Sequence, residues 1–152
     1  MLRGNGDGSF SQIGNAIVGL GPEDVVAGDL NFDGIDDLVT ADSFSFTVSV
    51  VLSNGLGGFG QATRYFGSLG PVSVRLADFD RDGDLDIAES VVGSSQVQVF
   101  ANNGNGTFAS PLALSVTGQP QTPVIADFNN DGRADIAVAG PNTLSVLINT
   151  SP

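Results

Sequence analysis

Three acidic segments share one spacing of oxygen-bearing side chains. The pattern D-x-[DN]-x-D-G-x-x-D fits residues 29–37, 78–86 and 127–135. Side-chain oxygens at positions 1, 3 and 5 of a tight loop converge on one point, and glycine at position 6 permits the sharp turn. The backbone carbonyl at position 7 and the aspartate at position 9 can complete a shell of hard oxygen ligands. The spacing therefore predicts a calcium ion in each loop.

The charge distribution agrees with bound cations. The chain of 152 residues carries 17 acidic residues against five arginines, which gives a net charge of −12. The three loops hold four, five and three of these acidic residues, and such crowding is repulsive unless a cation lies among them. Three Ca²⁺ ions would change the net charge from −12 to −6. The alternative is that aspartate and asparagine only form polar turns, but three copies in register favour calcium.

The composition excludes other kinds of chemistry. The sequence contains no cysteine, histidine or lysine, so thiol catalysis, imidazole ligands and Schiff-base formation are excluded. Nucleic acids and anionic membranes attract basic proteins, and they repel a chain as acidic as this one. No run approaches about 18 consecutive apolar residues, so we expect no membrane insertion.

The acidic loops belong to a repeat with a period of 49 residues. Phe10, Phe59 and Phe108 keep this spacing, and an Asn-Gly turn precedes each of them. We therefore interpret residues 1–152 as a single repeat domain with units 5–53, 54–102 and 103–152. The third unit is two residues shorter after its acidic loop, where we expect a surface hairpin.

Each unit is predicted to form four short strands. The acidic loop lies between the first and second strands, the third strand alternates apolar and polar residues, and the fourth follows the Asn-Gly turn. Four strands at this period predict an all-β chain built of β-propeller blades, with a β-sandwich as the alternative. The first strands are apolar on consecutive residues, such as Val25 and Val26, so we expect burial on both faces. The small residues Gly28, Ala77 and Ala126 suit the crowded centre of a ring.

The loop begins like an EF-hand, but the rest of that motif is missing. An EF-hand needs glutamate at position 12 and flanking helices, whereas position 12 is Thr40, Glu89 and Val138, and the flanks are strands. The acidic loop, the alternating strand and the N-G-x-G-x-F turn together resemble the FG-GAP/VCBS repeat family, which includes the calcium-binding propeller blades of integrin α-subunits. The resemblance covers nearly the whole chain.

The resemblance implies a set of calcium ligands in each loop. The implied side-chain ligands are Asp29, Asn31, Asp33 and Asp37; Asp78, Asp80, Asp82 and Asp86; and Asp127, Asn129, Asp131 and Asp135. The position-7 carbonyls belong to Ile35, Asp84 and Arg133. Asp36 and the Asp84 side chain have no ligating place in the pattern, and we expect both carboxylates to be solvated.

Three blades are too few to close a ring, since propellers use roughly four to eight. The chain begins with a predicted fourth strand, near residues 10–18, and ends with a predicted third strand. We expect either a homo-oligomer, in which two or three copies complete a ring, or a fragment of a larger propeller. No secretion signal precedes the first repeat, which favours a chain trimmed or cut from a secreted parent.

The resemblance points to extracellular protein or glycan ligands. We therefore expect a secreted or cell-surface module for recognition, adhesion or assembly, with a carbohydrate-binding lectin or a non-catalytic part of a polysaccharide-degrading enzyme as the alternative. Sugars stack on aromatic rings, and the candidates are Phe44, Phe46, Tyr65 and Phe66. We expect the phenylalanines to pack between blades and Tyr65 to be the better surface candidate.

Catalysis is not expected. A glycosidase needs two carboxylates at a set separation, and a lyase needs a base. The acidic residues outside the loops are scattered in the sequence: Asp7, Glu23, Asp24, Asp42 and Glu89. Only Glu89 is close to a loop, and we expect it to be a solvated strand residue.

Overall fold

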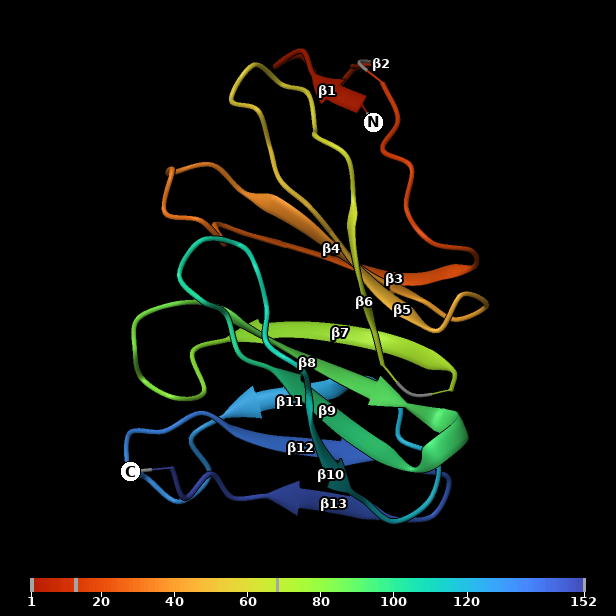
Figure 1. Ribbon diagram of the computed structural model, residues 1–152, viewed down its shortest axis with the longest axis vertical. Coiled ribbons are helices and arrows are strands. Elements are labelled where there is room, and N and C mark those ends of the chain that lie inside the picture. The colour runs from red at the N-terminus through yellow and green to blue at the C-terminus, as the bar shows by residue number, and fades with distance from the viewer. Residues whose placement is uncertain (1, 13, 68, 152) are drawn as a thin grey trace.

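The computed structural model describes residues 2–12, 14–67 and 69–151, and these residues form an all-β structure (Figure 1). Their one helix is a 3-10 turn at Val92–Ser94. Among the described residues, no helix is both apolar enough and long enough to span a bilayer. The absence of a longer helix fits a sequence in which apolar residues alternate between short glycine turns.

Three antiparallel sheets repeat one order of strands, in which each strand pairs with the next along the chain. The first sheet contains β3 (Pro22–Gly28), β4 (Asp37–Asp42), β5 (Thr47–Val51) and β6 (Thr63–Phe66). The second contains β7 (Pro71–Ala77), β8 (Asp86–Val91), β9 (Gln96–Phe100) and β10 (Leu112–Ser115). The third contains β11 (Pro123–Ala126), β12 (Asp135–Ala139) and β13 (Leu144–Leu147). These positions confirm the strands predicted from the repeat.

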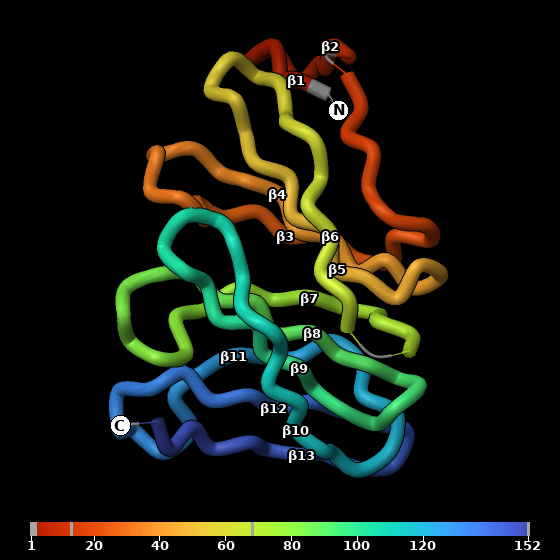
Figure 2. The backbone as a smooth tube through the Cα atoms, in the orientation of Figure 1, coloured from red at the N-terminus to blue at the C-terminus, as the bar shows by residue number. Residues whose placement is uncertain are grey.

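The sheets stack face to face, in the manner of propeller blades (Figures 1 and 2). β7 contacts β3 and β4 of the first sheet and β11 of the third, so the second sheet lies between the other two. One apolar core, which includes Val39, Val74 and Phe100, fills the first interface. A second core, which includes Ala88 and Ile136, fills the other.

Close approach of the sheets explains one of the small residues. A methyl group on Gly28 would come within 2.8 Å of the Leu76 side chain and 2.9 Å of the Leu85 side chain. The second sheet thus packs directly on the end of β3, in agreement with the crowded centre expected there.

The prediction that the first strands are buried on both faces is wrong for the two outer sheets. Val25 of β3 is 56% exposed and Val124 of β11 is 58% exposed. Only the middle sheet has a neighbour on each side, and Val74 of β7 is fully buried. Burial on both faces is therefore a property of the position in the stack.

The chain begins with a separate hairpin of β1 (Leu2–Gly4) and β2 (Phe10–Gln12). Its Gly4–Phe10 pair matches the isolated bridges Ser53–Phe59 and Asn102–Phe108 of the following repeats. Residues 14–17 match β6 and β10 in the repeat but lie outside the described strands. Among the described residues, the expected fourth strand is therefore formed only at residues 10–12.

Candidate metal-binding loops

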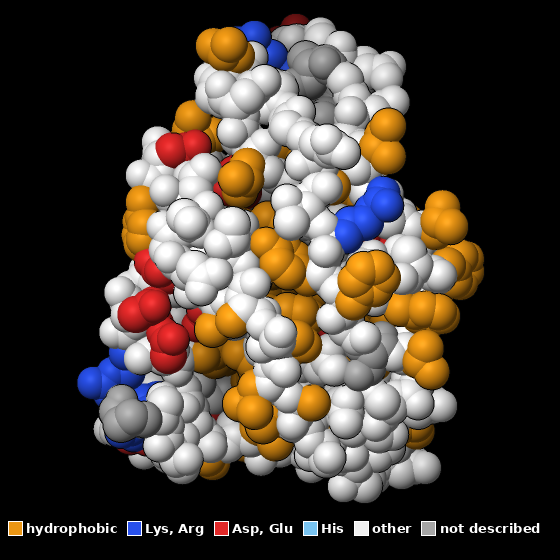
Figure 3. All heavy atoms as spheres, viewed as in Figure 1, with side chains coloured by type: hydrophobic (Ala, Val, Ile, Leu, Met, Phe, Trp, Pro, Cys, Tyr) orange, Lys and Arg blue, Asp and Glu red, His pale blue; other side chains and the backbone are white. Residues whose placement is uncertain are grey.

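The three acidic loops lie along one side of the stack, on the left in Figure 1. Each joins the first and second strands of a sheet: β3 to β4, β7 to β8, and β11 to β12. Figure 3 shows acidic side chains gathered on this side of the molecule. The repeat therefore places the three predicted sites at equivalent positions, one per sheet.

All three loops adopt the same backbone conformation. Position 4 is left-handed in each, with φ of 60° at Phe32, 66° at Arg81 and 62° at Asn130. The glycine at position 6 is also left-handed, and its N–H donates to the position-1 aspartate at 2.9, 3.0 and 2.8 Å. The left-handed residues at positions 4 and 6 turn the backbone of each loop around its carboxylates. Glycine at position 6 adopts this conformation without steric cost.

The position-9 aspartates, Asp37, Asp86 and Asp135, are buried and hold the loops in place. One carboxylate oxygen accepts the position-2 N–H at 3.1, 2.9 and 2.9 Å. The other accepts a backbone N–H just beyond the third strand at 2.7, 2.8 and 2.7 Å. Burial raises the pKa of Asp37 and Asp86 despite these hydrogen bonds. Each aspartate therefore ties the loop to its sheet in addition to its predicted role as a ligand.

The second loop has the donor set that best fits a divalent cation. Oxygens of Asp78, Asp80 and Asp86 all lie within 4.8 Å of one another. Asp82 is exposed and lies outside this group, and its carboxylate accepts the N–H of Asp84 at 2.9 Å. Carboxylate oxygens at this spacing, without nitrogen or sulfur ligands, are the chemistry that calcium prefers.

The first and third loops carry one carboxylate fewer at position 3. Asn31 donates its amide to Asp33 at 3.1 Å, and Asn129 donates to Asp131 at 2.8 Å. In the third loop the guanidinium of Arg133 also forms an ion pair with Asp131 at 2.7 Å. The hydrogen bond from Asn129 and this arginine lower the pKa of Asp131. Part of the negative charge of the third loop is thus already balanced by the protein.

Two asparagines that the sequence analysis did not single out lock neighbouring sheets together. The amide of Asn102 donates to the carbonyls of Leu30, in the first loop, and Leu85, in the second, at 3.0 and 3.1 Å. Asn149 repeats this arrangement with Phe79 and Ala134 at 2.7 and 3.2 Å. A recurring asparagine just after the third strand is the signal that could have revealed them.

Two predicted solvated carboxylates are in fact buried. Asp84 is 9% exposed, and its pKa is raised by desolvation and by the neighbouring loop carboxylates. Glu89 is 0% exposed because β8 lies in the middle sheet, where a methyl group on Gly67, which follows β6 of the first sheet, would come within 2.7 Å of its carboxyl. Asp36 is exposed, as expected.

The solvent exposure of the aromatic candidates is the reverse of the prediction. Phe44, Phe46 and Phe66 are exposed, with Phe44 at 73% and Phe66 at 78%. Tyr65 instead packs edge-on against Phe100 and Phe108, with ring centroids 6.5 and 5.6 Å away. Tyr65 and Phe66 are successive residues of β6, so burying one turns the other to solvent.

The repeated loop and the repeated sheet together identify the family. Residues 29–88 and 90–151 match the FG-GAP-like repeat. The chain belongs to this family. The resemblance predicted from the sequence is therefore confirmed, while the calcium ligands of the three loops, including the carbonyls of Ile35, Asp84 and Arg133, stay predictions.

Solved structures with a similar fold are β-propeller-like lectins and toxins. A lectin of Agrocybe aegerita, described as recognising non-reducing terminal N-acetylglucosamine, matches 99% of this chain at 24% identity and a TM-score of 0.63. A TcdB2–TccC3–Cdc42 complex matches 80% at 25% identity, and the Tc holotoxin pore of Photorhabdus luminescens matches 84% at 24% identity, both with TM-scores of 0.53. The matched region is 43% of the lectin chain and 6% of each toxin chain. No match to a curated protein sequence was found.

Proposed function

We propose that this FG-GAP-like chain is a non-catalytic calcium-binding module for extracellular recognition, adhesion or assembly. The observation that carries the proposal is the carboxylate cluster of Asp78, Asp80 and Asp86 in a loop whose conformation recurs in all three sheets. Calcium in these loops would neutralise the crowded carboxylates and stabilise the connection between first and second strands. Extracellular calcium modules bind at about 10⁻⁴–10⁻³ M, which suits extracellular fluid.

The loops are expected to differ in affinity. The second loop offers four predicted ligand carboxylates, whereas the first and third loops have asparagine at position 3 and offer three. The third loop also pairs Asp131 with Arg133. Because affinity rises with the number of charged ligands, we expect the second loop to bind calcium most tightly and the third most weakly.

A calcium titration by calorimetry, combined with thermal unfolding in calcium and in chelator, tests this proposal. Asp82→Ala should remove the tightest site and lower the melting temperature in calcium, but should change it little in chelator. Asp36→Ala is the matched control, since it removes one exposed carboxylate from a loop without removing a predicted ligand. Equal loss of stability in both conditions for Asp82→Ala would contradict the proposal.

The exposed aromatic residues favour a lectin-like activity as the second candidate. Phe44 and Phe46 lie in the β4–β5 turn, and Phe66 ends β6, where the N–H of Gly67 donates to the carbonyl of Phe46. Hydrophobic side chains also gather on the edge of the molecule away from the acidic loops (Figure 3). Exposed aromatic faces can stack on sugar rings, and the similar lectin is described as recognising N-acetylglucosamine.

An NMR titration with N-acetylglucosamine, followed by a glycan array, tests the lectin activity. Phe66→Ala should weaken binding, whereas Leu56→Ala, at a side chain 93% exposed in a different turn, should not. If the chain binds an extracellular protein and no glycan, its recognition function is protein binding. A glycan-cleavage assay in calcium should show no product, because the acidic residues outside the loops include the buried Asp42 and Glu89.

A further inference from the structure

A line of hydrogen bonds joins the first acidic loop to the second. The carboxylate of Asp37 accepts the N–H of Leu30 at 3.1 Å, and the carbonyl of Leu30 accepts the side-chain amide of Asn102 at 3.0 Å. The backbone N–H of Asn102 then donates to the carboxylate of Asp86 at 2.8 Å. The position-9 aspartates of the two loops are therefore connected through one loop residue and one asparagine.

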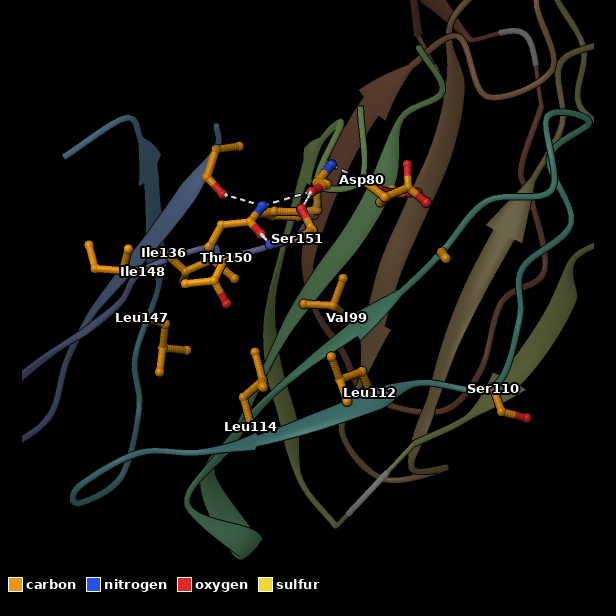
Figure 4. A pocket seen from close by; sticks show the side chains of 15 residues that line it. Asp80, Val99, Ser110, Leu112, Leu114, Ile136, Leu147, Ile148, Thr150 and Ser151 are labelled. Carbon is orange, nitrogen blue, oxygen red and sulfur yellow. Dashed lines mark hydrogen bonds between the residues drawn. The ribbon is translucent and has the colours of Figure 1, made fainter. Parts of the chain in front are cut away.

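The same steps join the second loop to the third. Asp86 accepts the N–H of Phe79 at 2.9 Å, and the carbonyl of Phe79 accepts the amide of Asn149 at 2.7 Å. The N–H of Asn149 donates to Asp135 at 2.7 Å, and the hydroxyl of Ser151 adds a donor to the Phe79 carbonyl at 3.3 Å. The hydrogen bonds drawn beside Ser151 in Figure 4 lie at the border of a mainly apolar pocket of about 450 Å³ between the second and third sheets.

The two links differ in their exposure to water. Asn102 is 5% exposed and Leu30 is 1% exposed, whereas Asn149 is half-buried. Hydrogen bonds are stronger where water is excluded, so the link through Asn102 gives the more sensitive test of what the line does.

Asn102 also holds a turn that lies against both loops. Its side-chain oxygen accepts the N–H groups of Gly104 and Gly106 at 3.1 and 3.2 Å. A methyl group on Gly104 would lie 2.8 Å from the Asp84 carboxylate, and one on Gly106 would lie 3.6 Å from the Cβ of Asn31. The turn therefore lies beside position 7 of the second loop and beside a predicted ligand of the first.

The first repeat has serine where the other two have these asparagines. The N–H of Ser53 donates to Asp37 at 2.7 Å, so the bond from the backbone to the position-9 aspartate is kept. The bond to a neighbouring loop instead needs the longer asparagine side chain with its amide donor. Serine at position 102 would therefore keep the bond to Asp86 and remove the one to Leu30.

We propose that Asn102 and Asn149 are positioning residues that couple calcium binding in neighbouring loops, so that an ion in one loop raises the affinity of the next. Repulsion among the carboxylates favours opening of an empty loop, and calcium would hold the loop closed. A closed loop fixes the groups that the asparagine joins to its neighbour, which lowers the cost of ordering the neighbouring loop. This inference rests on the proposed calcium binding and adds that the loops fill cooperatively.

An ion in one loop also acts on the next loop through its charge. The ion reduces the negative potential at the neighbouring loop, which opposes the coupling, and salt at about 0.15 M screens this effect over about 8 Å. The effect of charge is the same with asparagine or serine at position 102. A comparison of the two proteins therefore isolates the contribution of the asparagine.

A calcium titration followed by ¹H–¹⁵N NMR, at about 0.15 M salt, measures each loop separately. The amides of Gly34, Gly83 and Gly132 are the reporters, because each donates to the position-1 aspartate of its own loop. Asp80→Ala disables the second loop by removing one member of its carboxylate cluster. This change should weaken calcium binding in the first and third loops by about fivefold or more.

Substitution of each asparagine should remove one coupling and leave the other. In Asn102→Ser, Asp80→Ala should no longer affect the first loop but should still weaken the third. Asn149→Ser should give the reverse, and it provides the test if Asn102→Ser does not fold. Asn103→Ser is the matched control, because this exposed amide donates to Thr107 within its own turn. A loss of stability alone would affect both neighbouring loops alike.

Two results would overturn the inference. Affinities of the first and third loops that do not change with Asp80→Ala would mean that the loops bind independently. Changes that persist in Asn102→Ser and Asn149→Ser would mean that the coupling follows another route. In both cases the glycine amides still respond to calcium, so the proposed calcium binding stands. Amides that respond in none of the three loops would overturn the proposed function and this inference with it.

Discussion

Raising the pH is expected to weaken the folded protein through one side chain, Glu89. This residue is fully buried in the middle sheet, opposite Val74 on β7 and Gln98 on β9. Neither carboxyl oxygen has a hydrogen-bond partner among the described residues, and a methyl group on Gly67 would lie 2.7 Å from one of them. Desolvation, with a smaller contribution from the charge of Asp42, raises the pKa of Glu89 from 4.5 to about 8.

The size of the effect follows from linkage between proton binding and folding. Below pH 4.5 the carboxyl is protonated in both the folded and the unfolded chain, so it adds no pH dependence. Between pH 4.5 and about 8 only the unfolded chain releases the proton, and stability falls by about 1.4 kcal/mol per pH unit. The loss amounts to about 3 kcal/mol at pH 7 and becomes constant above about pH 8.

Urea unfolding followed by circular dichroism, in calcium, measures this loss. Because Asp37 and Asp86 also have raised pKa values, the informative quantity is the difference between wild type and Glu89→Gln at each pH. That difference should grow in favour of the variant from about pH 5 to pH 8. Glu89→Thr, which introduces the residue of the first repeat, should show the same slope.

Parallel stability curves for wild type and Glu89→Gln would refute the reasoning. They would mean that the carboxyl has the same proton affinity in the folded and unfolded chains. Glu23→Gln, at an exposed carboxyl, is the control for a change of one charge. The slope carries the test, so a constant offset caused by the new amide does not affect the conclusion.

Other predictions concern the contacts between sheets and the loops. Asn102→Ala should lower the free energy of unfolding by about 1–3 kcal/mol in urea, since two loop carbonyls lose their donor. Tyr65→Phe should cost a similar amount because the Phe108 N–H loses the hydroxyl that accepts it at 3.2 Å, and hydrogen exchange at that amide should accelerate. Gly28→Val should lower the melting temperature by overpacking against two leucines 2.8–2.9 Å from the new carbon. Calcium affinity measured by calorimetry should fall as the pH drops, and should begin to fall at a higher pH than for ordinary carboxyls, because burial raises the pKa of Asp86.

Much of the local structure was predictable because it depends on neighbouring residues. The spacing of the acidic loops, the glycine at position 6 and the alternation around Val97 and Val99 act within a few residues of one another. These features located the strands and the loop connections.

Burial could not be predicted in the same way, because it depends on what lies across the interface. Alternation separates Tyr65 from Phe66, but it does not say which of the two faces a neighbouring sheet. The sequence around Glu89 is that of an ordinary strand. Only the position of that strand in the middle sheet buries the carboxyl and makes its ionisation unfavourable. The donor role of Asn102 likewise depends on the carbonyl of Leu30, 72 residues away.

The sequence by itself determined the family, the repeat and the form of each loop, since all of these depend on short residue spacings that recur every 49 residues. The tertiary structure decided which surfaces are covered. Stacking gives the second sheet two neighbours and each outer sheet only one, so equivalent residues such as Val25 and Val74 differ in exposure. Packing between distant segments sets that difference, and no local pattern contains it.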